Sequence, residues 1–444
     1  MTAGAWLTAN WSLQDLERML PYNIRTVFEL MYMMMKKNIG KTVLAILLVL
    51  SAQAVSAQKE QFNPVYTGVT SLSIAPDARA GAMGDVGCAT DPYNDNNSQY
   101  WNPSKYPFAN SQAGLSLCYT PWLRQLVSDI DLANLVGYYK LDDYSALSGS
   151  LTYFSLGEVI VLSGGISSVT DGPQAIIRPY EFAFDFDYSR KLSELFSAAV
   201  GLRFIYSDLQ YHYDDELTPG KAFSADISMY YNNYIGLGRR DCLFGFGLNA
   251  SNIGSKISYD GGQTNEFIPT NLRLGLSLSV PIDEYNSFSF NADVNKLMVP
   301  TRPTYSQFMK EEHPGEDESD LSFTSDYATW LAATGYNELS PIAGIFKSFK
   351  DAPGGLEEEL REIYWGAGIE YNYNDQFLLR GGYHYENEFK GNRKYFTIGA
   401  GFRMNVFSLD AAYLISTAQS NPLDQTLRFT LSFDMDGLKA ILGR

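Results

Sequence analysis

Apolar and polar residues alternate with a period of two over many short segments after residue 110. The clearest is Leu427 to Phe433, in which Leu and Phe alternate with Arg, Thr and Ser; similar patterns run from Leu272 to Val280 and from Phe182 to Tyr188. Because successive side chains of a strand point to opposite faces, the pattern predicts strands with one apolar face. The predicted strands lie near residues 112–119, 133–140, 145–154, 181–190, 196–206, 224–231, 242–252, 271–280, 286–296, 362–373, 376–385, 394–405, 407–414 and 425–433.

The joins between these predicted strands alternate in length. Joins after even-numbered strands are mostly short, for example 141–143, 192–194 and 374–375. Joins after odd-numbered strands are mostly long, reaching about 26 residues before Glu181 and about 65 before Glu362. Short turns at one rim and long loops at the other are typical of outer-membrane barrels, whereas a soluble sandwich or propeller has no reason to keep this parity. We therefore predict an all-β protein whose transmembrane antiparallel β-barrel has about fourteen strands.

A barrel in lipid turns its apolar side chains outward and its polar side chains toward the lumen. An even number of strands closes the sheet, which removes unpaired edges and brings both termini to one side, expected to be the periplasm. The charged residues predicted to face the lumen are Glu181, Asp187, Arg203, Arg273, Asp293, Glu370, Arg380, Arg403 and Arg428.

Composition agrees with such a sheet. Hydrophobic residues make up 45% of the chain and aromatic residues 14%, yet the mean hydropathy is −0.17, so apolar residues are interleaved with polar ones. The net charge of −17 argues against a nucleic-acid partner, because binding a polyanion relies on clusters of Lys and Arg. Cys88, Cys118 and Cys242 are odd in number and lack metal-ligand spacing, so they predict neither a disulfide framework nor a metal site.

The N-terminal region predicts export. Lysines from Lys36 to Lys41 precede an apolar run from Val43 to Leu50, and small residues come before Gln58. This order is typical of a signal peptide, and the apolar core is too short to span a membrane as a helix. The expected segments are an extension upstream of the true start (1–34), a signal peptide (35–57), an N-terminal segment (58–110), the barrel (111–433) with a long external insertion (297–361), and a C-terminal tail (434–444).

Two stretches carry a family resemblance. The first is the Gly/Ala-rich sequence from Ala75 to Gly87, followed by an Asn-Pro pair; its motif residues are Asp77, Arg79, Gly81, Gly84, Asn102 and Pro103. The second runs from Ser348 to Glu359 and contains Asp-Ala-Pro-Gly-Gly, with further similarity around 391–397 and 421–433. The first stretch resembles the FadL-like outer-membrane transport superfamily. Together with the C-terminal half, it is most similar to the PorV (LptO) family of the type IX secretion system of Bacteroidetes.

The resemblance implies a FadL-like barrel whose N-terminal segment plugs the lumen. Small residues such as Gly81 and Gly84 suit this, because they let a backbone pass close to a wall. It also implies a carrier in the outer membrane of a Gram-negative bacterium. Such carriers accept secreted proteins by a C-terminal signal domain at the translocon barrel and deliver them to a surface sortase that attaches cargo to lipopolysaccharide. The implied surroundings are outer-membrane lipid and lipopolysaccharide, with no cofactor.

The candidate catalytic residues are few. Nucleophilic catalysis needs a base beside the nucleophile, and the chain has three histidines, His212, His313 and His384. The first two fall in predicted loops and the third faces the lumen, so we predict no enzyme, although a lipopolysaccharide deacylase activity has been proposed for PorV-like proteins and stays an alternative. The acidic run from Glu311 to Asp320 lacks the spacing of a calcium loop and is expected to be solvated and mobile.

Two functions remain open, and they place apolar surface differently. A carrier needs exposed apolar residues on its loops, because exposed apolar patches mark partner sites. A FadL-like transporter of hydrophobic small molecules needs them in the lumen. We favour the carrier, with a short helix predicted from Leu356 to Ile363 inside the long insertion. The candidate partner-binding residues are Ile160, Val161, Leu162, Ile342, Ile345, Phe346 and Phe349.

Overall fold

The computed structural model covers most of the chain after the predicted signal peptide. The described residues are 62–124, 127, 129–161, 175–209, 218–262, 264–317, 320–404, 406–417 and 423–435. The chain divides into two compact units, Gln61–Pro281 with Tyr285–Arg444 and Met1–Glu60 with Ile282–Glu284. The predicted extension (1–34) and signal peptide (35–57) therefore lie outside the described residues.

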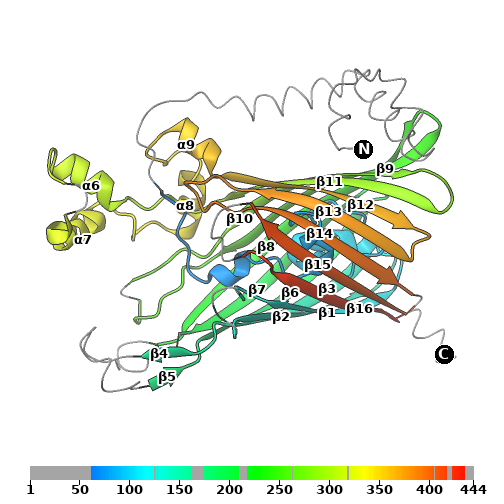
Figure 1. Cartoon of the computed structure of the whole chain (residues 1–444), viewed down its shortest axis with the longest axis horizontal. Helices are drawn as coiled ribbons and strands as arrows, with labels where there is room; N and C mark the ends of the chain where they lie inside the picture. The colour runs from blue at the N-terminus through cyan, green and yellow to red at the C-terminus, as the bar shows by residue number, and fades with distance from the viewer. Residues whose placement is uncertain are drawn as a thin grey trace, which may run out of the picture. The chain divides into compact units, whose positions relative to one another are not determined.

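Fourteen antiparallel strands form a closed barrel in the larger unit (Figure 1). The first strand pairs with the last, with Leu117 opposite Leu431. The strands are β1 (Ala113–Pro121), β2 (Asp131–Lys140), β3 (Ser145–Ser155), β6 (Tyr180–Ser193), β7 (Phe196–Asp208), β8 (Gly220–Leu237), β9 (Arg240–Gly254), β10 (Asn271–Pro281), β11 (Asn286–Leu297), β12 (Ile363–Tyr373), β13 (Phe377–Tyr385), β14 (Lys394–Arg403), β15 (Phe407–Ser416) and β16 (Leu427–Asp434). The predicted barrel and its fourteen strands are confirmed.

The joins follow the predicted parity. Joins that follow even-numbered barrel strands contain two to four residues, and those that follow odd-numbered strands contain eight or more. The two ends of the barrel are therefore called the short-join rim and the long-join rim. The longest join is residues 298–362, one residue later at each end than expected, because Leu297 completes β11. A hairpin of β4 (Val159–Val161) and β5 (Ala175–Ile177) lies in the join between β3 and β6.

Side chains alternate across the wall of the barrel as predicted. In β10, Leu276 is exposed on the outside and Arg273 is buried inside; in β16, Phe429 is exposed and Arg428 is buried. The other charged residues predicted to face the lumen are buried, except Arg403, which is half-buried and bonds to the N-terminal segment. The exposed apolar face suits contact with lipid acyl chains. Closure of the barrel also pairs the backbone N–H and C=O groups of the wall, which lipid could not hydrogen-bond.

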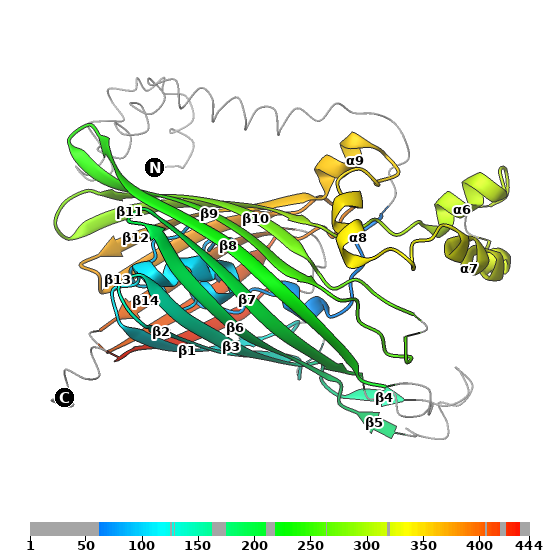
Figure 2. The same ribbon diagram turned by 180° about the vertical axis from the view of Figure 1, so that it is seen from behind.

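The helices lie in two places (Figure 2). Residues before β1 form η1 (Thr70–Ser73), α4 (Ala78–Gly81), α5 (Ser98–Trp101) and η2 (Pro103–Phe108). The join 298–362 forms α6 (Tyr305–Glu312), η4 (Leu321–Phe323), α7 (Thr324–Ala333), α8 (Pro341–Lys347) and α9 (Leu356–Arg361). Among the described residues, no helix combines the length and the apolar composition needed to cross a membrane.

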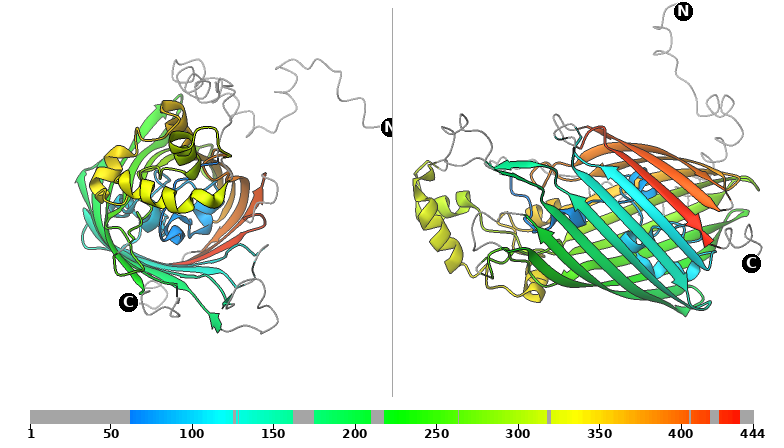
Figure 3. Two further views of the ribbon diagram at one scale, coloured as in Figure 1. Left: turned by 90° about the vertical axis from the view of Figure 1, so that its left-hand side faces the viewer. Right: turned by 90° about the horizontal axis from the view of Figure 1, so that it is seen from below.

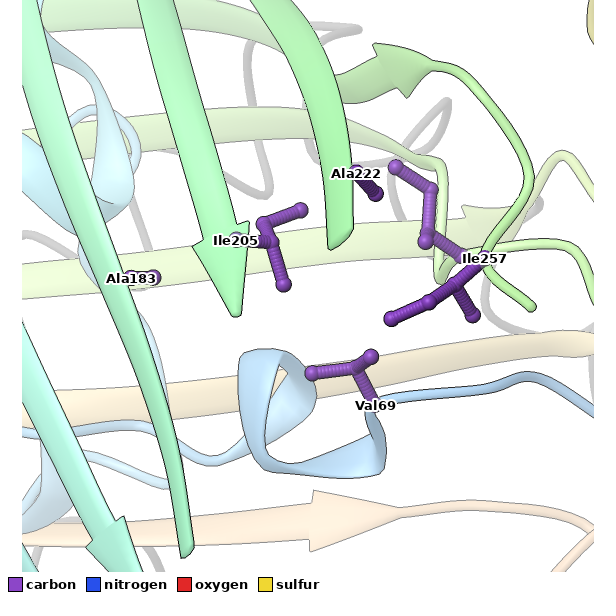
Figure 4. Close-up of a cluster of buried hydrophobic side chains, with 6 residues drawn as sticks. Val69, Ala183, Ile205, Ala222 and Ile257 are labelled. Atoms are coloured by element: carbon purple, nitrogen blue, oxygen red, sulfur yellow. The ribbon is translucent and has the colours of Figure 1, made fainter. Parts of the chain in front are cut away.

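The segment before β1 lies within the ring of strands (Figure 3, left). An apolar cluster joins it to the wall near the long-join rim, where Val69 packs with Ala183, Ile205 and Ala222 of three neighbouring strands (Figure 4). Ile257, from the join after β9, completes the contact. The segment is therefore packed against the inner wall by apolar contacts as well as by the polar contacts described below.

Candidate functional site

Asp77 and Arg79 fix the first turn of the inner segment. Asp77 caps α4: its Oδ2 accepts a hydrogen bond from Ala80 N at 2.9 Å, and its Oδ1 accepts one from Trp101 Nε1 at 2.5 Å. Burial raises the pKa of the Asp77 carboxyl to about 6. Arg79 pairs with Glu370 of β12 at 3.2 Å. One motif residue thus shapes the turn and the other ties it to the wall.

The motif glycines lie where the segment touches the wall. A Cβ on Gly81 would lie 2.4 Å from Nη1 of Arg428, and one on Gly84 would lie 2.5 Å from the carbonyl oxygen of Tyr383. Gly84 also has a positive φ of 77°, a conformation that favours glycine. A side chain at Gly84 would thus collide with the backbone of the wall, whereas one at Gly81 would meet the movable end of an arginine side chain.

The wall carries matching glycines that sequence reasoning missed. A Cβ on Gly368 of β12 would lie 2.5 Å from Cβ of Met83, and one on Gly382 of β13 would lie 2.1 Å from the carbonyl carbon of Met83. On β14, a Cβ on Gly399 would lie 2.4 Å from Cβ of Ala82. Three neighbouring strands thus each have a glycine, which has no side chain, at the position where the segment passes. Glycines on the inward face of adjacent strands were the signal that could have located this contact.

The Asn-Pro pair begins the helix η2. The Asn102 Oδ1 accepts a hydrogen bond from Ser104 N at 3.2 Å, and Pro103 occupies the first turn, where its missing N–H costs nothing. The Asn102 Nδ2 donates to the carbonyl oxygens of Cys88 and of Met229 in β8, each at 3.0 Å. One buried amide thus caps a helix and joins two parts of the segment to the wall.

Lys105 forms a buried ionic centre in the segment. Its Nζ, which has no exposed surface, lies 2.6 Å from Asp95 Oδ2 and donates to Thr90 Oγ1 at 2.8 Å. Burial disfavours the ionised carboxylate of Asp95, but Lys105 and Arg79 hold its pKa at about 2. Sequence reasoning did not single out Lys105 or Asp95, because neither belongs to an alternating strand.

Ion pairs also join strands to one another, and to the segment, on the inner face of the wall. Arg380 of β13 pairs with Glu370 and with Asp410 of β15, each at 2.6 Å. Arg428 of β16 pairs with Asp85 of the inner segment. These carboxylates and guanidinium groups thus neutralise one another across the lumen, which is a structural role.

A cavity of about 40 Å³ remains between the segment and the wall, enough for a few ordered waters. Its lining is mainly polar and aromatic and includes Tyr100, Trp101, Arg273, Tyr364 and His384. The histidine considered for catalysis is a contact residue here: the His384 Nδ1 lies 3.2 Å from the Gly84 carbonyl oxygen, and its ring stacks on Tyr395 at 4.7 Å.

A buried ionic network fixes the base of the long insertion to the barrel. Lys296, near the end of β11, pairs with Glu359 at 3.0 Å and with Glu362 at 2.6 Å. Lys390, in the join between β13 and β14, pairs with Glu358 at 2.6 Å and with Glu362 at 3.1 Å. Because these carboxylates belong to α9 and the residue after it, the network holds α9 between the end of β11 and the join that follows β13.

A second contact holds the helices of the insertion. Leu331 of α7 and Tyr336 after it pack with Phe267 and Val299, and Val65 of the inner segment packs against this cluster. The insertion is therefore folded against the long-join rim. The described acidic residues from Glu311 to Asp320 are exposed, as expected of a solvated run, and the first two of them, Glu311 and Glu312, complete α6.

The helix α8 presents an apolar surface. Ser340 caps it, accepting a hydrogen bond from Ala343 N at 3.3 Å. Gly344 and Ser348 are buried, and a Cβ on Gly344 would lie 2.7 Å from the Phe267 ring. The candidate residues Ile342 (59% exposed), Phe346 (72%) and Phe349 (46%) are exposed, and Ile345 is half-buried. We call Ile342, Ile345, Phe346 and Phe349 the α8 ledge.

The other candidate partner-binding residues lie on a different part of the same rim. Ile160 of β4 is exposed and pairs directly with Ile176 of β5, which is exposed too. Val161 ends β4, and Leu162 lies outside the described residues. The β4–β5 hairpin and α8 lie apart at the long-join rim (Figures 1 and 2). The structure thus unites the four ledge residues but does not bring Ile160 to them.

The described residues contain no group of three or more His, Cys, Asp or Glu side chains arranged to hold a metal ion. Cys88, Cys118 and Cys242 are buried free thiols. His212 lies outside the described residues, and His313 packs on Phe323 with ring centroids 4.1 Å apart.

A closed barrel with an apolar outer face and a polar, filled lumen defines an outer-membrane β-barrel protein. Similar solved structures include a Pseudomonas aeruginosa FadL homologue (12% identity, 84% of this chain and 99% of that chain, TM-score 0.41). The Pseudomonas putida toluene transporter TodX (10%, 84% and 98%, TM-score 0.43) and CdiB from Acinetobacter baumannii (12%, 72% and 60%, TM-score 0.35) are also similar.

The model of one protein family, described as type IX secretion system protein PorV, matches residues 56–304. The chain therefore belongs to the PorV family and is an outer-membrane component of the type IX secretion system. A search of curated proteins gave no match.

Proposed function

We propose that this protein binds the C-terminal signal domain of secreted proteins on the α8 ledge and carries them from the translocon barrel to the surface sortase complex. The observation that carries the proposal is the ledge itself: large apolar side chains are exposed on a helix whose other face is packed on the rim. Exposed apolar patches mark partner sites. A helix that is already packed against the rim loses little conformational entropy when a partner binds. Membership of a secretion family supports a protein partner.

The proposal includes an orientation. The long-join rim faces the cell exterior and both termini face the periplasm, as the parity of the joins favours. In this orientation the ledge and the β4–β5 hairpin meet cargo outside the cell. The inner segment, residues 58–110, acts as a plug, which the ion pairs of Arg79 and Arg428 with their partners support. The outer apolar face contacts lipid and, in the outer leaflet, lipopolysaccharide.

Transport of a hydrophobic small molecule is less well supported. The cavity beside the inner segment is small and mainly polar, whereas ligand pockets for organic molecules usually hold about 300–1,000 Å³ and are mostly apolar. His384 is engaged with Gly84 and Tyr395, which gives a structural reason for its burial and does not favour the deacylase alternative.

The double variant Ile342→Ser and Phe346→Ser tests the carrier function. Both side chains are exposed, so we expect the barrel to assemble and to keep its heat-modifiable mobility on gels. Cargo that retains its signal domain should accumulate or leave the cell unattached, which immunoblots of cell and medium fractions would detect. The control is Leu192→Ser, an equally exposed leucine near the short-join rim. Normal sorting in the ledge variant would refute the ledge as the cargo site.

A further inference from the structure

A pocket of about 450 Å³ opens beside the α8 ledge. It is lined by Gln307 and Glu311 of α6, Trp330 of α7, Lys347 at the end of α8, and Asp351. Its volume lies within the range of ligand pockets, and its lining combines two carboxylates with an indole. Lys347 directly follows Phe346 of the ledge, so a chain that covers the ledge can reach the pocket.

Asp351 is the chemically unusual member of this lining. Its Oδ2 accepts a hydrogen bond from Thr301 N at 3.1 Å, but its Oδ1 is buried and has no hydrogen-bond partner among the described residues. Burial and, to a smaller extent, the charge of Glu359 raise the pKa of Asp351 to about 6, while Lys347 opposes the shift. A buried carboxylate oxygen without a donor is costly and leaves the charge of Asp351 poorly compensated, so a cation in the adjoining pocket would be favourable.

The other walls suit the same kind of ligand. Glu311 is exposed, and its carboxylate receives one hydrogen bond, from Gln307 Nε2 at 2.9 Å. Trp330 lies across the pocket on α7, and an indole face attracts a cation. Among the described residues that line this pocket, two are acidic, Glu311 and Asp351, and one is basic, Lys347.

We propose that this pocket binds a lysine or arginine side chain of the protein that occupies the α8 ledge. The inference rests on the proposed function in one respect, namely that the ledge receives a protein. It adds the chemistry of the second contact: an aliphatic stem passing Trp330 and a cationic head that pairs with the carboxylate of Asp351 at the pocket wall, with Glu311 nearby.

The test measures binding of short peptides to the purified full chain in detergent micelles by calorimetry. The probes are the blocked tripeptides acetyl-Gly-Lys-Gly-amide and acetyl-Gly-Arg-Gly-amide, with acetyl-Gly-norleucine-Gly-amide as the uncharged isostere. We expect the basic peptides to bind at least about tenfold more tightly than the isostere, since a charge-assisted hydrogen bond contributes that much. Equal binding of the three peptides would overturn the proposal.

Variants locate the binding. Asp351→Asn keeps the acceptor for Thr301 N but removes the charge, and should weaken lysine-peptide binding about tenfold. Lys347→Gln removes the opposing charge and should tighten it. The matched control, Asp326→Asn, changes an exposed acid of α7 that is not among the lining residues and should leave the affinity unchanged. An unchanged affinity in Asp351→Asn would refute the assignment.

The two proposals fail separately. If the peptides bind as expected but the ledge variant sorts cargo normally, the pocket stands and the cargo function of the ledge falls. Suppose instead that the ledge variant blocks sorting, but Asp351→Asn changes neither peptide binding nor cargo sorting. In that case the cargo function stands and the cation pocket is refuted.

Discussion

The inner segment and the long insertion are both attached to the same barrel, but they differ in which side chains they bury and which they expose. In the inner segment, charges are buried and paired, as between Arg79 and Glu370. In the insertion, Lys296 pairs with Glu359 at the base, and large apolar side chains such as Phe346 are exposed on α8. A segment that must stay in place satisfies its groups internally, whereas one that must meet a partner leaves groups unsatisfied.

The largest expected effect breaks the inner attachment. Arg79→Ala removes one partner of a buried ion pair and leaves Glu370 without that charge, which typically costs about 3–5 kcal/mol. We expect the inner segment to become sensitive to protease in detergent and the thermal unfolding temperature to fall. Arg239→Ala, an exposed arginine of the turn between β8 and β9, is the control and should change stability by less than about 0.5 kcal/mol. A protease-resistant segment in Arg79→Ala would mean that the ion pair does not hold it.

A somewhat smaller effect is expected from a substitution on the outer, lipid-facing side of the barrel, to which both regions are attached. Leu276 is exposed in the middle of β10, and an arginine at the bilayer midplane costs about 2–4 kcal/mol. Leu276→Arg should therefore lower the yield of folded barrel in the outer membrane, measured by heat-modifiability, whereas Leu276→Met should not. Equal yields for the two variants would place Leu276 outside the hydrocarbon.

The barrel could be predicted from sequence because its determinants are local. Alternation within each strand and the length of each join were enough to place the fourteen barrel strands, though not the short hairpin of β4 and β5, and to assign Leu276 and Arg428 to opposite faces. The helix predicted from Leu356 to Ile363 is also confirmed, as α9, although it ends at Arg361 and Ile363 already belongs to β12.

The attachments could not be predicted, because they depend on pairs far apart in the chain. Arg79 and Glu370 are separated by 291 positions, and the contact of Gly382 with Met83 exists only once the barrel closes. A glycine in an alternating strand looks the same whether it faces lipid, water or another backbone. The pocket was missed for the same reason, since its acids and its indole come from separate helices and a loop.

The smallest expected effect concerns the boundary between the paired base of the insertion and its open outer part, where burial raises the pKa of Asp351 from 3.8 to about 6. An acid whose pKa is raised by folding binds its proton more tightly in the folded state, so the ionised form opposes local packing above about pH 6, and the penalty fades as the pH falls toward 4. The charged groups that act on Asp351 are Glu359 and Glu362, which contribute to the raised pKa, and Lys347, which opposes the rise. We therefore expect Asp351→Asn to slow proteolysis of the insertion at pH 7.5, and the difference between the two proteins to be clearly smaller at pH 5, as limited digestion followed by mass spectrometry would show. The control Asp326→Asn should follow the original protein at both values. A larger difference at pH 5 than at pH 7.5 would reverse the sign and mean that ionised Asp351 stabilises this boundary.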